Sequence, residues 1–173
     1  MRYLYGLFLM VAVWAAALAP VSAAETLPDL EGAVILTVSG LDSQEFPDGM
    51  MEFDEGRLRA LGAEVLRTST VWTEGVHEFT GVTLKDLVRY LGLDRASGSL
   101  RAVALNDYAV DIPLDPEAIE GPLLAYEMDG RPMPVRDKGP LWIIYPFDAN
   151  PEYRSEVNYT RSIWQLTRIE VHR

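Results

Sequence analysis

The chain is poor in the side chains that most often bind transition metals, cysteine and histidine. It contains no cysteine, which excludes zinc fingers, iron–sulfur clusters, cysteine nucleophiles and a thiolate bond to molybdenum. The two histidines, His77 and His172, lie far apart, and only His77 has acidic neighbours, at Glu74 and Glu78. This pattern predicts neither a metal site nor a Ser-His-Asp triad. We therefore expect no catalytic or metal-binding residues of these kinds.

The charge of the chain limits its partners. Its formal net charge is -11. An acidic surface of this kind repels nucleic acid and anionic lipid, so we expect no nucleic-acid partner. The charge suits a neutral ligand or a basic protein partner, and solubility alone is the alternative explanation.

The N-terminus has the pattern of a secretory signal peptide. Arg2 is the only charged residue before Glu25, an apolar run covers residues 4–19, and Pro20 ends it. Small residues at 21–23 predict cleavage after Ala23 or one residue later. The run is shorter than the roughly 20 residues that cross a bilayer, although an uncleaved anchor is the alternative. We therefore predict a signal peptide at 1–23, export to the periplasm, and one domain at 24–173.

The domain is large enough to hold itself together by packing alone. About 150 residues can bury roughly two-thirds of the unfolded surface, so disulfides are not needed. The clearest element is a helix over residues 84–91, with Thr83 as its cap and Gly92 at its end. Its apolar residues recur at the spacing of one helix face.

The remaining elements are mostly short strands. Asp54 and Asp115 each precede a short helical segment, the first running to Leu61. Asn106-Asp107 and Asp129-Gly130 predict tight hairpin turns. Strands are expected at residues 33–38, 64–72, 100–105, 108–112, 123–128, 131–135, 141–145 and 163–171. The fold class is therefore α+β, a single mixed domain that is richer in strand than in helix.

A succession of short motifs adds a family resemblance. The motifs are Trp72–Gly75, Phe79–Val82 before the helix, Asn106–Tyr108, Gly130–Pro134, Asp137–Leu141, Tyr145-Pro146, Arg161–Trp164 and Arg168–Val171. Their order resembles the oxidoreductase molybdopterin-binding domain of the sulfite oxidase family, most closely its small stand-alone periplasmic members. The resemblance covers roughly residues 33–171 and implies the sulfite oxidase fold.

The chain departs from the family pattern at one position that matters. In the family's enzymes a cysteine just before the G-V/L-x-L helix gives its thiolate to molybdenum. The matching stretch here, Thr68–Thr73, offers only hydroxyls, whose alkoxides are too basic to form at neutral pH. The chain is in this respect similar to PruR-type pterin-binding proteins, a branch without the cysteine.

That similarity implies a function without redox catalysis. It implies a periplasmic sensor with no covalently bound or metal-bound cofactor, which binds a molybdopterin-like or monapterin-like reduced pterin. It also implies a partner, the periplasmic domain of a membrane cyclic di-GMP enzyme or of a histidine kinase. Two alternatives remain: a molybdopterin-dependent oxidoreductase with a non-thiolate metal site, and an interaction module with no small ligand.

A pterin needs an apolar face to stack on, acceptors for its amino-pyrimidinone edge and polar partners for its tail, with basic residues if it carries a phosphate. The residues that the resemblance offers for these roles are Trp72 and Trp164 for stacking, Glu74 and Asp107 as acceptors, Asn106 and Tyr108 for a hydroxylated tail, and Arg136, Lys138 and Arg161 for a phosphate.

Each of these roles has a structural alternative. Trp164 alternates with apolar residues in an expected strand and fits core packing, whereas Trp72 among threonines fits a ligand contact. Asn106-Asp107 fits turn chemistry, and Glu74 fits a solvated loop charge. The basic residues fit surface charge clusters or ion pairs.

Overall fold

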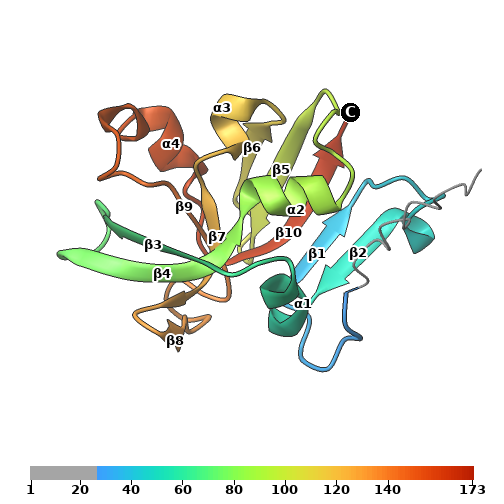
Figure 1. Ribbon diagram of the computed structural model, residues 1–173, viewed down its shortest axis with the longest axis horizontal. Coiled ribbons are helices and arrows are strands. Elements are labelled where there is room, and N and C mark those ends of the chain that lie inside the picture. The colour runs from blue at the N-terminus through green and yellow to red at the C-terminus, as the bar shows by residue number, and fades with distance from the viewer. Residues whose placement is uncertain (1–26) are drawn as a thin grey trace, which may run out of the picture.

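The computed structural model describes residues 27–173, so the expected signal peptide and its cleavage site lie outside the described residues. Two β-sheets, one mixed and one antiparallel, form the body of the domain (Figure 1). The first sheet has the order β2-β1-β10-β5-β6, and β1 is parallel to β10 while the other pairs are antiparallel. Its strands are β1 (Leu36–Ser39), β2 (Met50–Phe53), β5 (Ser99–Ala104), β6 (Ala109–Pro113) and β10 (Leu166–His172).

The second sheet runs β3-β4-β7-β8, and β9 also pairs with β7. All of its pairs are antiparallel, and a bridge between Leu141 and Leu166 ties it to the first sheet. The long β3–β4 hairpin extends to one side in Figure 1. Its strands are β3 (Glu64–Ser69), β4 (Val76–Thr83), β7 (Leu123–Met128), β8 (Arg131–Pro132) and β9 (Trp142–Ile144).

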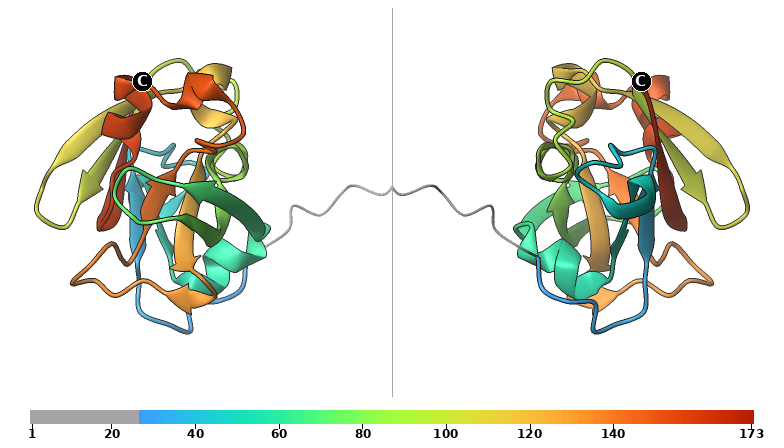
Figure 2. Two further views of the ribbon diagram at one scale, coloured as in Figure 1. Left: turned by 90° about the vertical axis from the view of Figure 1, so that its left-hand side faces the viewer. Right: turned by 90° about the vertical axis from the view of Figure 1, so that its right-hand side faces the viewer.

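Four short helices accompany the sheets within residues 27–173. They are α1 (Glu55–Ala60), α2 (Leu84–Tyr90), α3 (Pro116–Ile119) and α4 (Glu156–Arg161), with single 3-10 turns η1 (Pro47–Gly49) and η2 (Pro151–Tyr153). The helices α3 and α4 lie at the same end of the molecule (Figures 1 and 2). None of the helices in this part of the chain has the length and apolar character needed to span a membrane.

Two hydrophobic clusters form the core. The larger cluster joins the inner faces of the sheets with the buried face of α2, where Leu84, Leu87 and Val88 are almost fully buried. The smaller cluster surrounds Trp142 and Phe79 in the second sheet. Both Trp72 and Trp164 are only half-buried and pack against this smaller cluster, so its edge is aromatic.

Several local predictions are confirmed. The 84–91 helix is α2, Thr83 accepts a hydrogen bond from the Asp86 amide as its cap, and Gly92 has the expected positive φ of 67°. Asp54 and Asp115 cap α1 and α3 in the same way. Both hairpin turns are present. The α+β, strand-rich class is also confirmed.

Other local predictions were wrong. The closing strand begins at Leu166 rather than at residue 163, because Arg161 ends helix α4 and the chain must turn before it enters the sheet. The strand predicted over 64–72 ends at Ser69, and the one predicted over 131–135 ends at Pro132. The sequence analysis did not predict β2, β4 or α4.

Candidate functional site

An aromatic cavity of about 410 Å³ opens at the end of the molecule where α4 meets the β5–β6 turn. Four segments that are distant in the chain build it: the loop after β3, the β5–β6 turn, α4, and the link from α4 to β10. Its wall consists of Trp72, Ala104, Asn106, Tyr108, Tyr159, Thr160, Ser162, Ile163, Trp164 and Gln165. None of these residues carries a formal charge at neutral pH. The cavity is therefore suited to a flat, uncharged ring of modest size.

Trp72 is the centre of an aromatic cluster beside this cavity. Its indole meets Trp142, Tyr159 and Trp164 edge to face, with ring centroids 5.7–5.9 Å apart. Phe147 completes the contacts at 6.3 Å. Edge-to-face pairs of this kind fix the orientation of a ring as well as burying it. Trp72 is thus held in one position while part of its surface remains open to the cavity.

Trp164 has a cation against its ring. The Lys138 Nζ lies 4.3 Å from the Trp164 ring centroid and 5.7 Å from that of Trp142. An ammonium at this distance is attracted by the ring quadrupole. Lys138 does not line the cavity. It therefore acts on any stacked ligand only through the tryptophan.

Two amides in the wall have free hydrogen-bonding groups. The Asn106 Oδ1 accepts from the Tyr108 amide at 3.2 Å, and the Gln165 Nε2 donates to the Val135 carbonyl at 2.7 Å. These bonds fix the two side chains and leave the Asn106 amino group and the Gln165 oxygen for a ligand. The pair offers one donor and one acceptor to the edge of a heterocycle.

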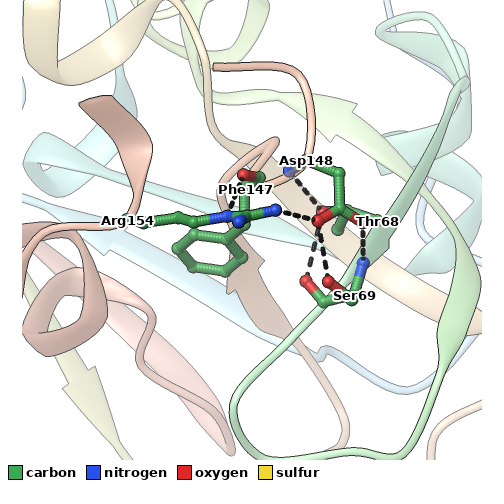
Figure 3. A network of polar contacts seen from close by, with 5 residues as sticks. All are labelled: Thr68, Ser69, Phe147, Asp148 and Arg154. Atoms are coloured by element: carbon green, nitrogen blue, oxygen red, sulfur yellow. Dashed lines mark hydrogen bonds and ion pairs between the residues drawn. The ribbon is translucent and has the colours of Figure 1, made fainter. Parts of the chain in front are cut away.

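The Thr68–Thr73 stretch, in which the resemblance implies the place of the family's cysteine, is held by hydrogen bonds within the protein. The Ser69 amide and hydroxyl both donate to the Asp148 carboxylate, at 2.6 and 2.7 Å. Arg154 also donates to Asp148, at 2.6 Å, and the Asp148 amide donates to the Thr68 hydroxyl at 3.1 Å. Figure 3 shows Asp148 at the centre of this network, between the end of β3 and Arg154. We call it the Asp148 latch.

The Asp148 carboxyl keeps its negative charge at neutral pH, so it continues to accept the hydrogen bonds of the latch. Hydrogen bonds from the Ser69 amide and hydroxyl, helped by Arg154, hold the pKa of the Asp148 carboxyl below its usual value. Further along the same loop, the Thr70 and Thr73 hydroxyls bond to each other at 2.8 Å, and Thr70 accepts from the Trp72 amide. The hydroxyls of Thr68–Thr73 thus serve to shape the loop that carries Trp72.

The other end of the loop that carries Trp72 is held by contacts of the His77 ring, which we call the His77 clamp. The His77 Nδ1 lies 2.7 Å from the Asp129 carboxylate, and its Nε2 lies 3.0 Å from the Glu74 carbonyl oxygen. Both neighbours are acceptors, so an N–H on either ring nitrogen can donate to the oxygen that it faces. The amide of Glu78 and then the His77 ring keep the pKa of Asp129 below its usual value.

The structure brings together only part of the predicted site. Trp72, Trp164, Asn106 and Tyr108 line the aromatic cavity. The two predicted carboxylate acceptors do not line it: Glu74 is exposed in the loop, and Asp107 points to Arg168, with which it forms a 2.8 Å ion pair. Asp107 has a positive φ of 63°, as the turn requires.

The three basic residues are also outside the cavity wall. Arg136 is exposed in the segment after β8, and Lys138 lies against Trp164 as described above. Arg161 lines a polar cavity between α3 and α4 and a shallow pocket that shares Tyr108 and Thr160 with the aromatic cavity. The cavity therefore presents no cation of its own to a phosphate group.

The sequence analysis missed Tyr159, Thr160 and Gln165. The first two belong to α4, which was not predicted although Ser155 caps it, Glu156 lies in its first turn and Arg161 in its last. Those three residues are the signals in the sequence from which α4 could have been predicted. Gln165 is placed by a backbone φ of 51° between α4 and β10, for which the sequence has no clear signal.

The donors present suit the pterin ring of a molybdenum cofactor and do not suit its phosphate or its metal. Within residues 27–173, no three histidine, cysteine or acidic side chains gather as a possible metal site. The hydroxyls at the position of the family's thiolate are already engaged in the Asp148 latch and the Thr70–Thr73 pair. The aromatic cavity, by contrast, has the flat faces and amide groups that a pterin ring needs.

Comparisons with known proteins agree with this architecture. Residues 56–149, more than half of the chain, match the family described as oxidoreductase molybdopterin binding domain. The fold is similar to the crystal structure of the sulfane dehydrogenase SoxCD from Paracoccus pantotrophus, with a TM-score of 0.56 and 15% sequence identity. The similarity covers 79% of this chain and 37% of that one, so this chain spans little more than a third of the larger protein. No curated protein sequence matches the chain at a significant level.

Proposed function

Because this chain belongs to the oxidoreductase molybdopterin binding domain family, we propose that it is a pterin-binding protein of that fold which carries no redox centre. The observation that carries the proposal is the pairing of an open aromatic cavity with a neighbouring loop whose hydroxyls are all engaged within the protein. In this proposal the chain keeps a cavity for the pterin ring. The Thr68–Thr73 stretch, where the family's enzymes have their cysteine, instead holds the loop that carries Trp72.

The cavity wall favours a pterin without a phosphate. Its charge-free lining can stack a ring against the open face of Trp72 or Trp164 and can bond a ring edge through Asn106 and Gln165. A phosphate would find no arginine or lysine in the wall. A reduced pterin with a hydroxylated tail, which Tyr108 and Thr160 can contact, is therefore the preferred ligand class.

The proposed role is that of a sensor in the periplasm. A protein that binds a pterin without converting it can report the amount of that pterin to a partner. Tyr108 and Val157, which are 52% and 54% exposed, line a shallow pocket that shares Tyr108 and Thr160 with the aromatic cavity, and the chain as a whole is acidic. These features favour a partner with an apolar centre and basic surroundings. The periplasmic domain of a membrane cyclic di-GMP enzyme or histidine kinase is the proposed partner.

Ligand-induced stabilisation tests the proposal. A pterin at 100 times its dissociation constant adds about 2.7 kcal/mol to the free energy of unfolding. For a domain of this size that corresponds to a rise in melting temperature of roughly 5–10 °C. We expect this rise with tetrahydropterins that carry a polyol tail, and a clearly smaller rise in the Trp72→Ala variant. Failure of every oxidised and reduced pterin to shift the melting temperature would contradict the proposal.

Elemental analysis separates the proposal from the oxidoreductase alternative. We expect protein purified from the periplasm to contain far less than one molybdenum atom per chain, and mass spectrometry of the small molecules it releases to reveal a pterin. Stoichiometric molybdenum in the same preparation would favour an enzyme with a non-thiolate metal site.

A further inference from the structure

Strand β6 forms one end of the first sheet, and among residues 27–173 it pairs with β5 alone. Figure 2 shows it at the outer margin of the molecule. A pocket of about 430 Å³ lies between β6 and α4. Four consecutive residues at the start of the strand, 108–111, line this pocket, so side chains of both faces of the strand border it. The pocket therefore follows the free edge of the strand, and we call it the β6 groove.

The direction of each backbone group in β6 follows from the hydrogen bonds at its two ends. The Ala104 amide donates to the Tyr108 carbonyl at 2.8 Å, and the Leu114 amide donates to the Gly98 carbonyl at 2.9 Å. Both pairs continue the register of β5 with β6. In an antiparallel ladder, hydrogen-bonded pairs alternate with pairs that share no hydrogen bond. The even-numbered residues of β6 therefore bond to β5, and the odd-numbered ones direct their backbone groups to the free side.

The free side of β6 thus presents unused backbone groups. They are the amides of Ala109 and Asp111 and the carbonyls of Ala109, Asp111 and Pro113. None of these groups takes part in a backbone hydrogen bond within residues 27–173. Pro113 has no amide N–H, so it ends the row of donors. A short second strand can pair with this edge.

The side chains beside this edge differ between its two faces. On the inner face, Val110 lines the β6 groove together with Val157 of α4. On the outer face, the guanidinium of Arg101 is shared by two carboxylates, at 3.6 Å from Asp111 and 3.9 Å from Glu170. One cation does not neutralise both acids, so a second cation placed beside Asp111 is attracted.

We propose that β6 binds an extended segment of a protein partner as an added strand, in which apolar residues alternate with lysine or arginine. The apolar side chains enter the β6 groove beside Val157, and the basic side chains lie on the outer face beside Asp111. Main-chain hydrogen bonds to Ala109 and Asp111 supply affinity, and the alternating side chains supply specificity.

This inference rests on the proposed sensor function and gives the chemistry of its partner. Tyr108 and Thr160 line both the β6 groove and the aromatic cavity. A bound pterin and an added strand therefore contact the same two side chains, which allows each to affect the binding of the other.

A second copy of this chain is a poor occupant of the edge. Antiparallel pairing of two β6 strands through their free sides places the two Asp111 carboxylates opposite or diagonally next to each other on one face. Like charges in these positions destabilise a strand pair. The net charge of -11 adds repulsion between whole chains.

The test is a titration of protein purified from the periplasm, without added pterin, followed by amide NMR shifts. The probe is a synthetic peptide with blocked ends, TKVKVKT, and its matched control has glutamate in place of each lysine. We expect the lysine peptide to shift amides of residues 108–113 and 156–161 and to bind about tenfold more tightly than the glutamate peptide, which corresponds to about 1.4 kcal/mol.

Two N-methylated forms of the lysine peptide test the main-chain bonds. One carries N-methyl groups on its valines and the other on its lysines. An added strand directs only one of these two sets of amides to β6, so one form should lose binding and the other should keep it. Equal binding of the two forms would show that the peptide is held by its side chains alone.

Variants of the protein test the same edge. Ala109→Pro removes an outward amide and leaves the bonds to β5 in place, so peptide binding should fall about tenfold or more, while the pterin-induced rise in melting temperature persists. Asp111→Lys should reverse the preference between the lysine and glutamate peptides, and this remains measurable if the proline variant folds poorly.

The proposal is overturned if the lysine peptide shifts none of these amides, if the glutamate peptide binds equally well, or if Ala109→Pro binds like the unaltered protein. It is also overturned if the chain forms dimers that Ala109→Pro dissociates, because the edge then belongs to a second copy. Peptide binding in a protein that responds to no pterin would contradict the proposed function and leave the β6 edge as a peptide site.

Discussion

The indoles of Trp72 and Trp164 meet edge to face, with ring centroids 5.7 Å apart and an interplanar angle of 70°. One comes from the loop after β3 and the other from the link between α4 and β10. Because both also contact Trp142, the position of each tryptophan depends on the other. The ligand site is therefore sensitive to changes in either loop.

Replacing Trp72 by alanine should affect both binding and stability. The change removes the centre of the aromatic cluster, so pterin affinity should fall by about tenfold or more, which is about 1.4 kcal/mol. Because Trp72 is half-buried, the free energy of unfolding should fall by about 2–3 kcal/mol, below the cost for a fully buried tryptophan. Pterin fluorescence quenching and urea denaturation measure the two effects. Val71→Ala, in the same loop but 62% exposed, should change neither.

The Asp148 latch should make stability depend on pH. The pKa of Asp148 is lowered in the folded state, so its contribution is fully present above the unfolded value of about 3.9 and is lost as the pH falls through the lower, folded value. Asp148→Asn should therefore reduce the free energy of unfolding at pH 7 by about 1–2 kcal/mol. The difference from the unaltered protein should persist in urea titrations at about pH 5 and shrink at about pH 2.5. A constant difference across this range would contradict the role assigned to the carboxylate.

Removing the His77 clamp should loosen the loop that carries Trp72. Glutamine at position 77 cannot reproduce both contacts, to Asp129 and to the Glu74 carbonyl, because its reach and geometry differ from those of imidazole. Hydrogen exchange at residues 73–76 should become faster, and pterin affinity should fall several-fold. His172→Gln is the control, because His172 is exposed at the far end of β10. Unchanged exchange in the His77 variant would show that the clamp does not order the loop.

Gly81 should tolerate no side chain. A Cβ at this position would lie 2.2 Å from the Leu124 carbonyl oxygen, where β4 passes close to β7 next to a register shift. Gly81→Ala should therefore lower the free energy of unfolding by about 2–3 kcal/mol or more. In contrast, Gly56→Ala in α1 should be neutral or stabilising by up to about 1 kcal/mol, because its Cβ would meet its nearest neighbour at an ordinary 3.4 Å. Thermal denaturation of both variants provides the comparison.

The sequence predicts the elements that have strong local signals. The apolar stripe and the Thr83 cap of α2, the Asp54 and Asp115 caps, and the two hairpin turns all depend on residues close together in the chain. In each case the local hydrogen bond or turn geometry is the same one that fixes the element in the structure.

The sequence did not predict elements that depend on distant contacts. Helix α4 has six residues, none of them buried, so it shows no periodic apolar stripe. Strand β4 contains Gly81, a residue that weakens a strand on its own and is tolerated here because β7 passes close by. The link after α4 alternates like a strand, but the end of the helix prevents pairing before Leu166.

The candidate site was likewise predictable only in part. The aromatic types at positions 72 and 164 indicated a stacking site, yet only the fold decides which polar residues join them. Glu74 and Asp107 are near those motifs in the sequence and outside the cavity in space, while Gln165 lines the cavity because of a local turn. Charge and residue type alone cannot distinguish these cases.

Strand β10 follows all other elements in the chain, yet it occupies the middle of the first sheet, between β1 and β5. Until β10 has been synthesised, the strand pairs β1–β2 and β5–β6 have no common partner. Folding of this half of the domain must therefore wait until β10 has been synthesised. A premature stop codon before residue 166 would divide the sheet rather than trim its edge.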